Sequence, residues 1–136
     1  EETWRVACFA GFLAGREAMK RLAAAGKGTL IFTGASASLR GRPPFGAFAS
    51  AKAGLRALAQ ALAREFGPKG VHVAHVVIDG GIDGDRIAQF PGFVAQKGEA
   101  GLLDLDALAD TWWMLHRQHR TAWTFELDLR PFKEPF

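Results

Sequence analysis

Two short apolar segments, TLIFTG at 29–34 and VHVAHVVID at 71–79, are separated by a long stretch with helical periodicity. Both segments are rich in β-branched residues and predict strands, and the run at 29–34, entered and left through glycines, suits a strand that is buried on both faces of a sheet. A strand, a helix and a second strand in this order indicate a right-handed crossover that leaves the strands parallel. The pattern therefore predicts an α/β fold, with a parallel sheet covered by helices.

Further elements extend this unit on both sides. Helical periodicity predicts helices at 3–25, 45–66 and about 106–119, and the first two end at glycines. Residues 123–129 alternate between apolar and polar side chains, which predicts a third strand with one covered face. The order helix, strand, repeated three times, amounts to about half of a doubly wound sheet.

The first helix has an unusual amino-terminal half. Its segment at 6–15, VACFAGFLAG, carries no charge on any face. A helix that is apolar all round is normally buried all round, so we expect another element to cover this segment.

No glycine-rich phosphate loop follows a predicted strand, because neither GASAS nor DGGIDGD has the G-x-G-x-x-G spacing. We therefore expect residues 1–136 to form a single partial domain that lacks the dinucleotide-binding half.

Composition excludes several classes of protein. Of 136 residues, 49% are hydrophobic and 23% are charged, which is typical of one ordinary globular domain. The net charge is only +3 and the basic residues are scattered, which argues against a nucleic-acid interface. No run is long enough to span a membrane, and the chain begins with two glutamates rather than a basic signal segment. One cysteine, Cys8, suits a reducing compartment, so we expect a cytoplasmic protein.

The histidines do not predict a metal site. His72 and His75 are three residues apart on a strand and therefore point to opposite faces, while His116 and His119 have no carboxylate at ligand spacing.

The order of four motifs resembles the C-terminal half of a classical short-chain dehydrogenase/reductase. These motifs are the TLIFTGAS strand and loop, the FASAK helix, the VHVAHVVID strand and the glycine turn. The resemblance runs over essentially the whole chain. It implies the C-terminal half of a Rossmann-like doubly wound parallel sheet, with about three strands and three main helices, and an NAD(P)-linked oxidoreductase activity.

The resemblance also implies a site. A tyrosine four residues before a lysine serves this family as general acid/base, and here Phe48 stands at that position before Lys52. The family serine, 13 residues upstream of the tyrosine, corresponds to Ala35, with Ser36 as the possible substitute. In the turn after the second strand, Gly80 and Ile82 correspond to residues that line the nicotinamide.

Phe48 has no proton to deliver to a developing alkoxide, and the chain contains no tyrosine at all. We therefore expect this chain alone to be inactive and not to bind NAD(P), with Lys52 keeping at most a ribose contact. In the chain taken alone, a solvated helix lysine is the simpler interpretation of Lys52. Two functions stay open: a divergent oxidoreductase subunit, or a non-catalytic remnant that serves as a dimerisation or scaffold module.

Both interpretations require a partner. An uncovered helix segment and an unpaired strand edge promote association. We expect a homo-oligomer formed through helices 3–25 and 45–66, the second of which is rich in alanine, or a complementing N-terminal half. The sequence does not distinguish NAD from NADP and does not indicate the substrate.

Overall fold

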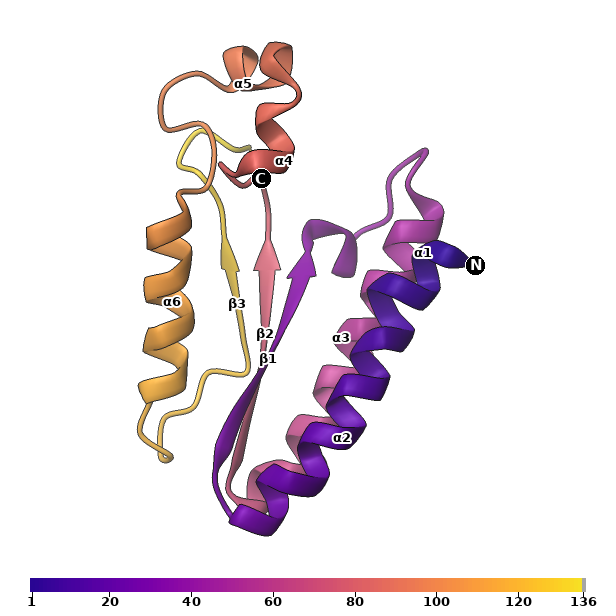
Figure 1. Cartoon of the computed structure of the whole chain (residues 1–136), viewed down its shortest axis with the longest axis vertical. Helices are drawn as coiled ribbons and strands as arrows, with labels where there is room; N and C mark the ends of the chain where they lie inside the picture. Colours follow the sequence, from indigo (N-terminus) through magenta and orange to yellow (C-terminus); the bar gives the residue numbers. More distant parts are fainter. Residues whose placement is uncertain (136) are drawn as a thin grey trace.

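A computed structural model describes residues 1–135 and confirms the predicted α/β class. Three parallel strands form one sheet in the order β1 (Gly28–Ala35), β2 (Val71–Ile78), β3 (Glu126–Leu129). Helices α2 (Ala10–Ala25) and α3 (Gly46–Phe66) lie side by side against one face of the sheet, and α6 (Leu105–Arg117) lies against the other (Figure 1). Because the strands follow one another in one direction while α3 and α6 lie on opposite faces, the two crossovers have opposite hands, and one of them departs from the expected right-handed connection.

The N-terminal helix runs from Glu2 to Ala25 in three parts. A short α1 (Glu2–Trp4) is followed by one π-helical segment, η1 (Arg5–Phe9), before α2 begins. The helix ends at Gly26, whose left-handed φ of 64° suits glycine. The predicted helix at 3–25 is therefore confirmed.

Within the described residues, the segment 6–15 is covered on one side only, and cover for its remaining faces by a partner stays a prediction. Val6 is 72% exposed and Phe12 is 43% exposed, whereas Cys8 is buried. Cys8 faces Gly54 of α3, because a Cβ built on that glycine would lie 3.0 Å from the sulfur. Only the side of the helix that faces α3 and the sheet is covered.

The two predicted central strands differ in burial. All eight residues of β2 are buried, as expected for a strand with a neighbour on each side. In β1 only Phe32 and Gly34 are buried, because within the described residues β1 lies at the edge of the sheet. Phe32 and Leu30 pack into the core on one face and Ile31 into the core on the other, so both faces of this strand are covered, though less completely than in β2.

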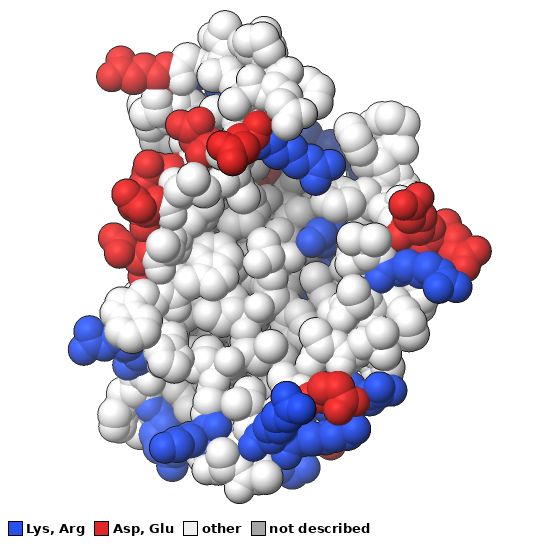
Figure 2. All heavy atoms as spheres, in the orientation of Figure 1, with Lys and Arg blue, Asp and Glu red and all other residues white. Residues whose placement is uncertain are grey.

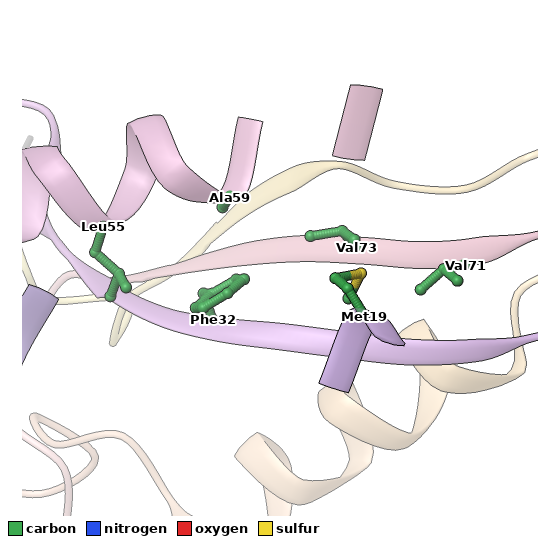
Figure 3. Packing of buried hydrophobic residues seen from close by; sticks show 6 residues of the cluster. All are labelled: Met19, Phe32, Leu55, Ala59, Val71 and Val73. Atoms are coloured by element: carbon green, nitrogen blue, oxygen red, sulfur yellow. The ribbon is translucent and has the colours of Figure 1, made fainter. Parts of the chain in front are cut away.

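Alternate residues of β2 point into two separate cores. On the α2–α3 face, Val71 and Val73 pack with Met19, Phe32 and Leu55 (Figure 3). On the other face, a second core joins β2 to α6 (Leu105–Arg117); its buried members are Ala74, Val76, Ile78, Leu108 and Leu115.

The remaining segments depart from the predictions in detail. The region after β2, where no helix is predicted from the sequence, contains α4 (Asp85–Ala88) and α5 (Pro91–Lys97). A 3-10 turn, η2 (Ser36–Ser38), follows β1, and another, η3 (Gly67–Lys69), follows α3. The last strand is shorter than the predicted 123–129 and begins only at Glu126.

Candidate functional site

The predicted site residues come together where β1 and β2 end. This carboxyl edge of the sheet carries η2 and the start of α3 on one side, and the glycine turn before α4 on the other (Figure 1). Ligands of open α/β sheets bind outside the carboxyl ends of the strands, so the location suits a binding site.

Lys52 lies on α3 and is fixed to the end of β1. Its Nζ donates a hydrogen bond to the backbone oxygen of Thr33 at 2.9 Å. The side chain is half-buried, and desolvation lowers the pKa of its ammonium below the ordinary value. The interpretation of Lys52 as a solvated surface lysine is therefore wrong. An ammonium has three donors, and the contact with Thr33 uses one of them.

Phe48 lies one turn before Lys52 on the same helix, and the ammonium is 5.8 Å from the centre of its ring. The side chain is 37% exposed. It lines a cavity of about 440 Å³ together with η2 and the loop before α3, and a second cavity of about 660 Å³ together with the glycine turn and α4. Phe48 therefore contributes to the lining of both cavities.

The serines after β1 have different roles. Ala35 ends the strand and offers no hydroxyl. Ser38 is buried, and its Oγ accepts a hydrogen bond from the Ala35 backbone at 3.1 Å. Ser36 lines the smaller cavity beside Phe48. Of these two serines, Ser36 has its side chain available to a ligand in that cavity.

The glycine turn is tied to both neighbouring segments. Gly80 has a φ of 151°, and a Cβ there would lie 2.7 Å from Pro131. Asp79, which is buried, forms ion pairs with Arg40 at 3.3 Å and with Arg130 at 3.4 Å. Ile82 forms an isolated parallel bridge with Leu103. Gly80 and Ile82 both line the larger cavity.

A polar network beneath this edge was not foreseen from the sequence. His75 of β2 is fully buried, and its Nδ1 lies 2.9 Å from Glu126 Oε2 on β3. Arg56 of α3 donates two hydrogen bonds to the same carboxylate, at 2.6 and 2.8 Å. Burial lowers the pKa of His75, against the opposing effect of Glu126, and the bonds from Arg56 lower the pKa of Glu126. The only sequence signal was a charged residue within a predicted strand.

Charged side chains are distributed unevenly between the two ends of the sheet. In Figure 2, lysine and arginine atoms gather at the lower end, where the strands begin, and the centre of the visible face is uncharged. At the carboxyl edge, basic atoms are visible in the hollow between the α4 region and α3.

Residues 1–135 contain neither a candidate metal site nor a helix that could span a membrane. Their histidine, cysteine, aspartate and glutamate side chains include no group of three that could hold a metal ion. Within the same residues, every helix is too short or too polar to cross a bilayer.

Comparison with known proteins decides the family. The family profile described as short chain dehydrogenase matches residues 1–89, which extend from α1 through α4. The chain belongs to this family. The resemblance stated from the sequence is thereby confirmed, and no curated protein matches the sequence.

Solved structures share the fold of this chain. A short-chain dehydrogenase from Rhodopseudomonas palustris is 44% identical, with a TM-score of 0.74, over 96% of this chain and 51% of that one. An alcohol dehydrogenase from Thermococcus sibiricus, complexed with 5-hydroxy-NADP, is 23% identical with a TM-score of 0.79, over 97% of this chain and 53% of that one.

A third structure, a gluconate 5-dehydrogenase from Burkholderia cenocepacia in complex with NADP and tartrate, is 17% identical with a TM-score of 0.77. The match covers 96% of this chain and 56% of that one. This chain therefore spans about half the length of these three solved structures.

Proposed function

We propose that this chain supplies the nicotinamide-ribose side of an NAD(P)-linked short-chain dehydrogenase fold, with Lys52 as the ribose ligand. The observation that carries the proposal is the position of Lys52, held 2.9 Å from the Thr33 backbone oxygen at the carboxyl edge. The remaining ammonium donors suit the hydroxyls of a ribose. Gly80 and Ile82 line the neighbouring cavity and would lie along the nicotinamide.

Bound nicotinamide cofactors in related structures support the choice of ligand. The Thermococcus sibiricus and Burkholderia cenocepacia proteins are described in complex with 5-hydroxy-NADP and with NADP. When bound, such a cofactor supplies a hydride. This chain's own residues would bind and orient its ribose.

The same edge lacks the group that completes a reduction. A hydride acceptor develops alkoxide character and needs a proton in the same step. Phe48 carries no ionisable group, and Ala35 offers no hydroxyl to polarise a carbonyl. Ser36 supplies the nearest replacement for that hydroxyl, but a serine does not replace the acid. This chain alone is therefore proposed to contact the ribose part of a cofactor without binding the whole dinucleotide, for which it has no G-x-G-x-x-G loop, and without turning over a substrate.

A second function, association through α2 and α3, is favoured by one observation. Large apolar side chains stay uncovered on the N-terminal helix, including Trp4, which is 48% exposed, and Leu13, which is 37% exposed. A groove of about 320 Å³ between α2 and α3 is lined mainly by apolar side chains such as Phe12 and Leu58, with the charged residues Arg16, Lys20 and Glu65 also in its lining. A second copy of this chain is the proposed occupant; a complementing N-terminal half would cover the free edge of β1 instead. A cytoplasmic location is proposed on the single, buried Cys8.

Nicotinamide mononucleotide tests the ribose site, because it contains the part of the cofactor that Lys52 would hold. Saturation-transfer NMR on the purified chain should show contact to its ribose protons. The contact should be lost in Lys52→Met and retained in Lys27→Met, which removes a lysine at the other end of the sheet. Equal contact in both variants, or none in the unmodified chain, would contradict the proposal.

Intact mass, measured beside native mass by light scattering, tests association. A co-purifying polypeptide of similar size would support a complementing half, and homo-oligomers would support pairing of this chain. A monodisperse monomer at micromolar concentration would contradict both.

A further inference from the structure

A cavity of about 440 Å³ lies between η2, the loop before α3 and the first turn of α3. Its size falls within the range of small-molecule sites. The residues that line it are Ser36, Ala37, Arg40, Arg42, Phe45, Phe48 and Ala49. Two of these side chains are cationic and none is acidic. A cavity with this lining favours an anion.

Arg40 is oriented toward the cavity by an anchor beneath it. Its Nη2 lies 3.3 Å from Asp79 Oδ2, while the side chain stays 38% exposed. The same carboxylate oxygen also contacts Arg130 at 3.4 Å, so Asp79 divides its charge between two guanidiniums. Arg40 is therefore held in place without being fully neutralised, and most of its five N–H donors have no contact with Asp79.

Arg42 supplies a second cation on a defined turn. Its backbone oxygen accepts a hydrogen bond from Phe45 at 2.8 Å, and the Phe45 oxygen accepts one from Ala49 at 2.8 Å. The Arg42 side chain forms no ion pair with any residue of the described range 1–135. A guanidinium in this state is available to a carboxylate, which it binds in a bidentate geometry.

The rest of the lining is apolar. Phe45 is 60% exposed and Phe48 is 37% exposed, so both rings present surface to a ligand. The lack of a phenolic hydroxyl on Phe48 makes its side of the cavity more apolar. Arg42 and the partly neutralised Arg40 together offer little more than one positive charge, which matches a monoanion better than a phosphate dianion.

We propose that this cavity binds a small organic carboxylate with an aromatic or apolar body. The carboxylate would lie between Arg40 and Arg42, with its body against Phe45 and Phe48. As a binding site, this assignment stands on the cavity alone. As a subsite for a substrate that approaches the nicotinamide past Phe48, it rests on the proposed function.

Phenylacetate and its neutral isostere phenylacetamide test the site, with dissociation constants measured by NMR titration of the purified chain. Phenylacetate is expected to bind at least about fivefold more tightly than the amide, since a charged hydrogen bond is stronger than a neutral one. Arg42→Gln should abolish this preference. Arg120→Gln, which makes the same change of charge at the opposite end of the sheet, should preserve it, and Phe45→Ala should weaken both probes.

Equal affinities for the two probes, or equal behaviour of Arg42→Gln and Arg120→Gln, would overturn the proposal. Both arginines are exposed, and circular dichroism verifies that each variant folds. The ribose site is measured separately with nicotinamide mononucleotide, which Arg42→Gln should leave unchanged. Loss of ribose contact with retained carboxylate preference would refute the cofactor proposal alone, and the reverse result would refute this one alone.

Discussion

His75 Nδ1 lies 2.9 Å from Glu126 Oε2, and the two residues are register partners on the neighbouring parallel strands β2 and β3. Because burial favours the neutral imidazole and the carboxylate is ionised, Nδ1 is assigned the ring proton. Its N–H donates a hydrogen bond to Glu126. His75 Nε2 is then an acceptor, buried with no hydrogen-bond partner and directed at Gly34. Arg56 completes the network from α3, so one carboxylate joins the sheet to the helix that carries Lys52.

Stability should fall on mild acidification because of His75. Its pKa is lowered in the folded chain, mainly by burial, from the ordinary value of 6.5. Below pH 6.5 the unfolded chain therefore binds a proton that the folded chain does not. The free energy of unfolding should be constant with respect to this group above pH 6.5, and should decrease below it by up to about 1.4 kcal/mol per pH unit.

Urea unfolding between pH 5.5 and 7.5 measures this slope. His75→Gln should flatten the slope, whereas His119→Gln, at an exposed position, should leave it unchanged. An identical slope in the unmodified chain and His75→Gln would show that His75 is not the group responsible.

Gly34→Ala should destabilise the fold. A Cβ at this position would lie 2.2 Å from His75 Nε2 and 3.0 Å from Ser38 Oγ, and both groups are buried. Overpacking of this kind costs about 1–3 kcal/mol. Gly46→Ala is the matched control, because a Cβ there meets open space at the start of α3 and should change stability by less than about 1 kcal/mol. Thermal unfolding of the two variants measures the difference. Equal melting temperatures would contradict the close packing of Gly34 against His75.

Phe48→Tyr would place the only tyrosine of the chain beside Lys52, so its titration is directly visible in the ultraviolet. The ammonium lies 5.8 Å from the Phe48 ring centre, and a nearby positive charge favours the phenolate. The phenol pKa should fall by about one unit from its usual value of about 10. The double variant Phe48→Tyr/Lys52→Met should restore it. Phe90→Tyr, at a 59% exposed position, should titrate normally. A normal pKa in Phe48→Tyr would mean that Lys52 does not act on this position.

Phe12→Glu should weaken self-association. Phe12 is 43% exposed and lines the apolar groove between α2 and α3, where a second copy is proposed to pack. A buried charge without a partner is strongly unfavourable at an interface, so the dissociation constant should rise at least about tenfold. Sedimentation velocity over a concentration series measures it. Trp113→Glu, on α6 at the opposite face, should leave the dissociation constant unchanged. A larger effect of Trp113→Glu than of Phe12→Glu would place the interface on α6 instead.

Local sequence patterns were sufficient for the element order. The helices at 3–25 and 45–66 and the strand at 71–79 were predicted within a residue or so, because each has a strong periodicity of its own and a glycine near its end. The short helices α4 and α5 were missed, since segments of four and seven residues give little periodic signal. What covers the apolar segment at 6–15 stays a prediction, because periodicity describes a helix and not what lies beside it.

The sequence by itself determined the parallel α/β arrangement and placed Phe48 and Lys52 on one helix face, since their spacing of four residues is close to one helical turn. Only the tertiary structure decided that Lys52 is half-buried against Thr33, that Ser36 and not Ser38 lines a cavity beside Phe48, and that Arg40 is anchored on Asp79. It also brought His75 and Arg56 to the carboxylate of Glu126. His75 is 51 residues from Glu126 in the sequence, and Arg56 is 70 residues from it. Such contacts depend on strand register and on how the crossovers pack, and neither leaves a local pattern in the chain.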